Sequence, residues 1–143
     1  MINDLKNILV LCTGNSCRSQ IAEGYLRFFA GDKAIIYSAG IETHGVNPKA
    51  IITMMEDGID ISQHTSNNIS EYLAINFAYI ITVCDNAQEH CPVFISNAKK
   101  YHYNFPDPAK VTGTDDEILE AFRQVRQMIK DYAEKFVADN LPH

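Results

Sequence analysis

The chain has 143 residues, of which 46% are hydrophobic and 21% charged, with a formal net charge of −6 at pH 7. This profile is that of an ordinary globular protein with one core, so we expect a single domain over residues 1–143. The acidic balance argues against broad nucleic-acid or anionic-membrane binding, and any bound anion must be captured locally. Because no apolar run has membrane length and no signal-peptide pattern opens the chain, we expect a cytoplasmic protein without nucleic-acid or membrane partners. We also expect a monomer.

Four strands alternate with helical patterns along the chain. Short apolar runs predict strands at Ile8–Leu11, Lys33–Ser38, Asn76–Val83 and Lys99–Tyr103, the last at an edge of the sheet. Helical spacing predicts helices at Gln20–Phe29, from Pro48 to before Gly58, over a weak patch at Asn68–Leu73, and at Asp115–Asp139 behind a Thr114–Glu117 capping box. This alternation predicts an α/β fold, a four-stranded parallel sheet with helices on both faces. Ligands of such sheets bind beyond the carboxyl ends of the strands.

A small, polar stretch follows the first strand and leads into the first helix. A strand–loop–helix junction of this kind turns backbone N–H groups inward at a helix N-terminus, where proteins hold oxyanions. Arg18 adds a planar fork of donors that matches a tetrahedral oxyanion. Gly14 and Asn15 tolerate positive φ, which a tight loop requires. The expected oxyanion-binding residues are Thr13, Gly14, Asn15, Ser16, Cys17, Arg18 and Ser19.

Cys12 opens this stretch and is the candidate nucleophile. Amide dipoles and the Arg18 guanidinium beside its thiol should lower the pKa of Cys12, which would leave a thiolate next to a bound oxyanion. A lone cysteine is otherwise most often a buried core thiol, but the loop around Cys12 argues against that interpretation. For Cys17, which has no separate role in the spacing, packing is the better interpretation.

Two further cysteines, Cys84 and Cys91, follow the third strand. Cys84 should open onto the same sheet edge as Cys12. If the segment between Cys84 and Cys91 is helical, the two residues lie about 10 Å apart along its axis. A disulfide needs Cα atoms within about 7 Å, so these thiols can bond only if the segment unwinds. Alternatives are a cysteine-containing loop over the core, or a zinc site that uses His90 and Cys91, for which a full ligand set is missing.

The Cys-x5-Arg-Ser motif directly after the first strand resembles the phosphate loop of the low-molecular-weight protein tyrosine phosphatase superfamily. That superfamily includes phosphatases and thioredoxin-coupled arsenate reductases. The segments YSAG, GIDISQHTS, TVCDNAQEHCP and FPDPA extend the resemblance to the arsenate reductases over nearly the whole chain. The resemblance therefore implies a low-molecular-weight phosphatase-like fold and an arsenate reductase.

The resemblance also implies roles for individual residues. Cys12 would be the nucleophile, Cys84 the second thiol, Cys91 the exit thiol and Asp107 the general acid. Arsenate, or phosphate in its place, would be the bound oxyanion, and thioredoxin would supply electrons without a tightly bound cofactor. Without the other motifs, Asp107 would be an ordinary turn aspartate between two prolines.

A phosphatase that hydrolyses phosphate monoesters through a phosphocysteine at Cys12 is the main alternative, and a non-catalytic phosphate- or arsenate-binding regulator is a third. Two features argue against a tyrosine phosphatase. Ala109 follows Asp107-Pro108 where those enzymes usually have tyrosine, and residues 39–48 contain no phenylalanine, tyrosine or tryptophan. A phenyl ring would therefore lack a flat apolar wall in the pocket.

Members of the superfamily sometimes hold a potassium ion beside the phosphate loop. Asn15, Glu23 and Ser38 resemble that pattern, but Asn67 stands where a carboxylate is expected. Glu23 is equally well interpreted as a helix-surface residue, and no protein metal site is predicted.

Overall fold

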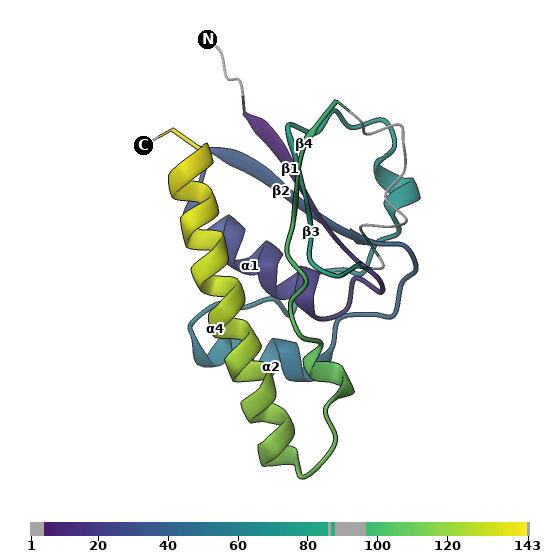
Figure 1. The fold of residues 1–143 in the computed structure, drawn as a ribbon, viewed down its shortest axis with the longest axis vertical. Helices are drawn as coiled ribbons and strands as arrows, with labels where there is room; N and C mark the ends of the chain where they lie inside the picture. Colours follow the sequence, from purple (N-terminus) through teal and green to yellow (C-terminus); the bar gives the residue numbers. More distant parts are fainter. Residues whose placement is uncertain (1–4, 86, 88–96, 143) are drawn as a thin grey trace.

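The computed structural model describes residues 5–85, 87 and 97–142, and its strands form one parallel sheet (Figure 1). The strand order is β2-β1-β3-β4, which makes β1 and β3 central and β4 an edge strand, as predicted. The strands are β1 Lys6–Cys12, β2 Ala34–Gly40, β3 Tyr79–Thr82 and β4 Lys99–His102. The predicted four-stranded parallel sheet is therefore confirmed.

The bounds of all four strands differ from the prediction by one to three residues, and those of β2 and β3 bear on the site. β2 runs past Ser38 to Gly40, because its last residues stay paired with β1 as far as Cys12↔Gly40. β3 covers only four residues of the predicted Asn76–Val83, since its ladder with β1 begins at Ile8↔Tyr79 and ends at Leu11↔Thr82. Both central strands thus end at the same edge, where Cys12 and Cys84 lie.

Three α-helices, α1 Arg18–Ala30, α2 Pro48–Glu56 and α4 Asp115–Asn140, gather on one side of the sheet (Figure 1). Two short 3₁₀ helices, η1 Ile69–Tyr72 and η3 Pro108–Lys110, complete the described helices. η1 replaces the weak helical patch and covers the other face of β2, where the Tyr72 ring lies 5.2 Å from that of Tyr37. Successive side chains of a strand point to opposite faces of the sheet. Tyr37 of β2 therefore packs on the η1 face, and its neighbour Ile36 packs on the face that carries the α-helices.

The predicted starts of α2 and α4 are confirmed in detail, whereas α1 begins at Arg18 and not at the predicted Gln20. The Asn47 side chain accepts a hydrogen bond from Lys49 N at 2.8 Å, with Pro48 in the first turn of α2. Thr114 and Glu117 form the expected capping box of α4. A side-chain cap satisfies backbone donors that a helix cannot satisfy itself and contributes about 1 kcal/mol.

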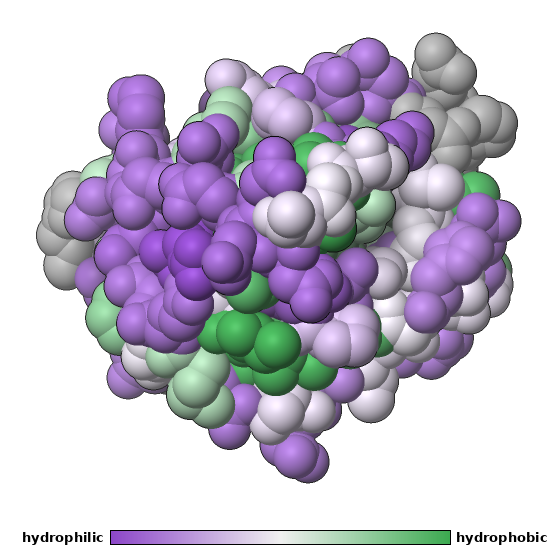
Figure 2. Space-filling model, turned by 90° about the horizontal axis from the view of Figure 1, so that it is seen from below, coloured by the Kyte–Doolittle hydropathy of each residue, from purple (hydrophilic) through white to green (hydrophobic). Residues whose placement is uncertain are grey.

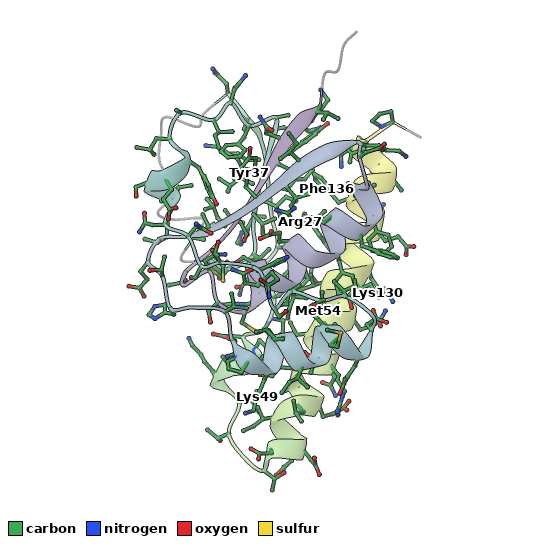
Figure 3. All side chains as sticks on the ribbon, turned by 180° about the vertical axis from the view of Figure 1, so that it is seen from behind. Arg27, Tyr37, Lys49, Met54, Lys130 and Phe136 are labelled. Carbon is green, nitrogen blue, oxygen red and sulfur yellow. The ribbon has the colours of Figure 1, made fainter. Side chains whose placement is uncertain are left out.

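α4 closes the core against the sheet and against the end of α2. Phe136 and Lys130, both labelled in Figure 3, lie on α4. The Phe136 ring packs edge-on against Tyr79 and Tyr101, with centroids 5.4 and 5.1 Å away. Lys130 reaches Asp57, just after α2, with Nζ 2.9 Å from Oδ2. The four central β1 side chains, Ile8, Leu9, Val10 and Leu11, are fully buried. Burial of such a side chain contributes about 1.5–3 kcal/mol, so β1 is a rigid base for the loop that leads from Cys12 into α1.

The surface seen from the end that carries α2 and η3 is largely hydrophilic, with one compact apolar patch (Figure 2). Exposed apolar side chains on these elements include Ile52 and Met55 of α2, and Val111 follows η3. In the described part of the chain, no helix combines the length and apolar character needed to cross a membrane.

Candidate active site

The loop between β1 and α1 turns its N–H groups into a cavity because its carbonyls are occupied elsewhere. The carbonyl oxygens of Thr13, Gly14 and Ser16 accept hydrogen bonds at 2.9–3.0 Å from the N–H groups of Glu42, His44 and Asn47, respectively. In a trans peptide the C=O and the N–H point in opposite directions. The N–H groups of the three peptide units whose carbonyls are engaged in this way therefore face the cavity. This is the arrangement expected for an oxyanion site.

The Asn15 side chain stabilises this loop on the side that faces away from the cavity. It is the one non-glycine residue in the described part of the chain with positive φ, 47°. Its buried side chain donates to Ser19 Oγ and Ser38 Oγ, each at 2.9 Å, and accepts from Asn67 N at 2.7 Å. These three bonds compensate for an uncommon backbone conformation. Asn15 and Ser19 therefore support the predicted oxyanion loop without lining its cavity.

The cavity beyond the loop has a volume of about 280 Å³. Its lining contains most of the predicted site: Cys12, Thr13, Gly14, Ser16, Cys17, Arg18 and Asp107, together with His44, Ala109 and Lys110. Among the described residues, no phenylalanine or tyrosine lines it, which agrees with the missing aromatic wall expected from the sequence. A small inorganic oxyanion needs no such wall.

Arg18 and Asp107 come together from opposite ends of the chain. Arg18 Nη1 donates to Phe105 O at 2.9 Å, and Nη2 lies 3.5 Å from Asp107 Oδ2. The carbonyl bond fixes the guanidinium plane, while the second nitrogen stays at the cavity. Asp107 also caps η3, since its side chain accepts a hydrogen bond from Ala109 N at 3.0 Å. Asp107 is therefore both a turn aspartate and a residue of the site.

Cys84 lies beside the loop, since β1 and β3 are neighbours. Its Sγ is 3.3 Å from Thr13 Oγ1, and it shares a hydrogen bond with the Cys12 thiol. The expectation that Cys12 and Cys84 open onto one edge is therefore met. Cys91 and His90 lie outside the described residues, so the geometry expected between Cys84 and Cys91 stays a prediction.

The Cys12–Cys84 pair changes the acidity expected of the nucleophile. The hydrogen bond to Cys84 and burial raise the pKa of Cys12, against the lowering effects of Arg18 and the Thr13 N–H. The same hydrogen bond, helped by those from the Thr13 hydroxyl and the Ala87 N–H, lowers the pKa of Cys84 to about 5. With both thiols present, the prediction of a lowered pKa for Cys12 was therefore wrong. The two thiols therefore titrate as a pair: the first ionisation places one negative charge on the pair, and that charge opposes the second ionisation.

Cys17 packs as predicted. It is buried, and burial, with a smaller effect of Asp107, raises the pKa of its thiol to about 12. A thiol with that pKa remains protonated near neutral pH and is a poor nucleophile.

The residues that resemble a potassium site are already paired with one another. Glu23 is buried, so its interpretation as a surface residue was wrong. Glu23 Oε2 accepts from Arg27 Nε at 2.8 Å, and Oε1 accepts from the Ser38 hydroxyl. The Asn67 side-chain oxygen accepts from Thr65 Oγ1 at 2.7 Å. Because Arg27 offsets the carboxylate charge and the oxygens are engaged, these residues do not fit a potassium ion.

Two lining residues had no signal in the sequence. The His44 ring packs against Gly14 of the oxyanion loop so closely that a Cβ on Gly14 would lie 2.3 Å from His44 Cδ2. The Nε2 atom of His44 is 2.8 Å from Glu42 Oε1. Lys110 enters the cavity wall at the end of η3. Both belong to segments predicted as loops, where no periodicity indicates which side chains face inward.

Residues 7–141 match the family model of the low molecular weight phosphotyrosine protein phosphatases. Similar curated proteins include the arsenate reductase of Halalkalibacterium halodurans, 49% identical over 133 residues, with 90% of this chain and 96% of that protein covered. Arsenate reductase 1 of Staphylococcus epidermidis is 50% identical over 131 residues, with 92% of this chain and 95% of that protein covered.

Solved structures agree with these relatives. An arsenate reductase in the phosphate binding state superposes with a TM-score of 0.82 at 32% identity, covering 94% of this chain and 98% of that chain. A tyrosine phosphatase from Erwinia amylovora has a TM-score of 0.78 at 22% identity, covering 97% of this chain and 95% of that chain, which is a likeness of fold.

Proposed function

This chain belongs to the arsenate reductases of the low-molecular-weight phosphotyrosine protein phosphatase family, and we propose that it reduces arsenate to arsenite with electrons supplied by thioredoxin. The observation that carries the proposal is the second thiol: Cys84 hydrogen-bonds Cys12, and Cys12 lines an oxyanion-sized cavity. Ester hydrolysis needs one thiol there, whereas reduction of arsenate needs two electrons, which two thiols supply when they become a disulfide.

Arsenate binds through the inward N–H groups of the loop and through the Arg18 guanidinium. Cys12 Sγ attacks arsenic while its proton passes along the thiol–thiol hydrogen bond to Cys84. The arsenic–oxygen bond opposite breaks, and Asp107 delivers a proton so that the oxygen leaves as water. Arsenic is still pentavalent at this stage and is bound to the sulfur of Cys12.

Cys84 loses its proton to solvent and attacks Cys12 Sγ. A sulfur–sulfur bond forms, the sulfur–arsenic bond breaks, and its electron pair stays on arsenic, which leaves as trivalent arsenite. Once Cys12 is bound to arsenic, the hydrogen bonds from the Thr13 hydroxyl and the Ala87 N–H remain, and both favour the Cys84 thiolate. The contact with Thr13 holds its sulfur next to the atom that it attacks.

Cys91 then attacks Cys84 Sγ, which forms the Cys84–Cys91 disulfide and frees Cys12 as a thiolate. Thioredoxin supplies the two electrons that return this disulfide to two thiols. No other bound cofactor is required, because every electron passes through sulfur. This relay is the part of the proposal that depends on Cys91.

The experiment is arsenate reduction coupled to thioredoxin, thioredoxin reductase and NADPH, measured beside hydrolysis of p-nitrophenyl phosphate. Cys84→Ser and Cys91→Ser should each abolish multiple-turnover reduction and leave hydrolysis largely intact, since hydrolysis uses Cys12, Arg18 and Asp107. Full arsenate turnover by both variants would disprove the relay. Equal loss of hydrolysis would mean that these cysteines mainly hold the fold.

Phosphate-ester hydrolysis remains the alternative, since Cys12, Arg18 and Asp107 share one cavity. Fast hydrolysis by the unaltered protein without thioredoxin-dependent arsenate turnover would favour the phosphatase.

A further inference from the structure

Asp85, the residue directly after Cys84, is held by two residues at the end of the neighbouring strand. Asp85 Oδ1 lies 2.7 Å from His102 Nε2, and Asp85 N donates to Asn104 Oδ1 at 3.3 Å. The side chain and the backbone of Asp85 are thus both tied to the β4 side of the sheet edge. Neither contact involves the oxyanion loop.

His102 itself has a position set by the sheet. It is the register partner of Thr82 in the β3–β4 ladder, and its Nδ1 lies 2.7 Å from Thr82 Oγ1. The His102 side chain is 24% exposed, whereas that of Asp85 is 64% exposed. The imidazole therefore links Thr82, two residues before Cys84, to Asp85, one residue after it. The backbone that carries the second thiol is fastened on both sides.

We propose that His102 and Asp85 are positioning residues for the second thiol, and that the hydrogen bond between them keeps Cys84 Sγ against Thr13 and Cys12. The inference deepens the proposed function and rests on it, since it concerns the step in which Cys84 attacks Cys12. Neither residue lines the oxyanion cavity, so the pair acts on that step through the Cys84 backbone.

Cys84 needs an additional contact to hold its position because of where it lies relative to the sheet. The last register pair of β3 is at Thr82 and its last backbone hydrogen bonds, to Leu11 and from Phe105, are at Val83, so Cys84 is the first residue beyond the sheet. Attack at sulfur requires a close and aligned approach, and a displacement of about 1 Å can cost up to about 100-fold in rate. A pair between a side chain fixed by the sheet and the residue next to Cys84 limits that displacement.

The test is a single turnover without thioredoxin, in which arsenite release per protein is followed by rapid quench. We expect His102→Ala and Asp85→Ala each to slow arsenite release about 10-fold. The double variant should also be about 10-fold slower rather than about 100-fold, because both changes remove one contact. His102→Gln, which keeps an N–H donor, should recover part of the rate. Hydrolysis of p-nitrophenyl phosphate should stay within about 2-fold of the parent in every variant.

Asp139→Ala is the matched control, since Asp139 is also an exposed carboxylate with one side-chain partner, Lys135 on α4, whose Nζ lies 2.9 Å away. It should leave both rates unchanged. Parent rates in the His102 and Asp85 variants, or a double variant about 100-fold slower, would overturn the inference. Parallel loss of hydrolysis would overturn it as well, because the pair would then support the fold rather than Cys84.

A second measurement does not depend on arsenate. In the same variants, the pH profile of iodoacetamide alkylation at Cys84, resolved by mass spectrometry, should move to higher pH, since a displaced Cys84 loses its hydrogen bonds from Thr13 and Cys12. An unchanged profile would contradict the inference. A parent that releases no arsenite but shows the shifted profile in its variants would disprove the proposed function and leave the positioning intact.

Discussion

Thr13 Oγ1 lies 3.3 Å from Cys84 Sγ, so the residue after the nucleophile contacts the second thiol. The contact crosses between β1 and β3, and it occurs because both strands end at one edge. Thr13 therefore belongs to the oxyanion loop and also contacts the second thiol. The acidity of each thiol then depends on the presence of the other.

The first prediction rests on that dependence. In Cys84→Ala, the pKa of Cys12 should fall below its value in the parent protein, because the group that most strongly raises it is removed while Arg18 and the Thr13 N–H remain. Alkylation of Cys12 by iodoacetamide, followed by mass spectrometry, should begin at lower pH. Bound phosphate should slow it. Cys17→Ala is the control and should leave the Cys12 profile in place; a profile in Cys84→Ala identical to the parent's would contradict the shared ionisation.

The second prediction concerns Asp107. Asp107→Asn should lower hydrolysis of p-nitrophenyl phosphate about 100-fold, which is the typical loss of a general acid. Phosphate should still protect Cys12 from alkylation, because Arg18 keeps its bond to Phe105 O. Asp115→Asn, at an exposed aspartate in the first turn of α4, should change neither measurement. Loss of protection together with hydrolysis would mean that Asp107 shapes the cavity instead.

The third prediction compares Gly40, which packs against the oxyanion loop, with Gly14, which belongs to it. A Cβ on Gly40 would come within 2.3–2.8 Å of the backbone atoms Glu42 O, Asn15 N and Thr13 O, none of which can swing aside. Gly40→Ala should therefore destabilise the protein by about 1–3 kcal/mol in urea unfolding and abolish protection by phosphate. Gly14→Ala meets only the His44 ring, which is more than half exposed, and should cost less. Equal costs for the two variants would refute the distinction between rigid and movable neighbours.

The fourth prediction concerns the disulfide proposed between Cys84 and Cys91. If the segment between these thiols is helical in the reduced protein, it must unwind before they can bond, so oxidation should increase amide hydrogen exchange in residues 85–91. Exchange in β1 and β3 should stay unchanged, and mass spectrometry should find the Cys84–Cys91 linkage. A stable Cys12–Cys17 bond with unchanged exchange would instead favour a phosphatase whose neighbouring thiol shields the nucleophile.

The strands, the helices and the oxyanion loop could be predicted because each has a local signal. Apolar runs indicated the four strands, and Thr114 with Glu117 indicated the start of α4. The side-chain surroundings had no such signal. Glu23 lies in a continuously buried run of α1, Ser19–Leu26, where amphipathic spacing does not separate core from surface. The raised pKa of Cys12 depends on a contact with the chain beyond β3 that no local pattern contains.

The register of β3 and β4 was equally inaccessible to the sequence. It pairs Thr82 with His102 and thereby brings the imidazole to Asp85. A shift by one residue would turn His102 to the other face of the sheet. Taken separately, a histidine in an edge strand and an aspartate after a cysteine indicate nothing about a shared role.

Thr13 and Cys84 are 71 residues apart in the sequence, and only the docking of β3 on β1 brings them together. Contacts of such long range form late in folding, since a large loop must close first. During synthesis, β1 and its cysteine emerge well before β3 exists, so the newly made chain carries thiols of ordinary acidity. The altered acidity of the Cys12–Cys84 pair is therefore a property of the completed fold. A thiol activated towards oxidants exists only after the surrounding sheet has formed.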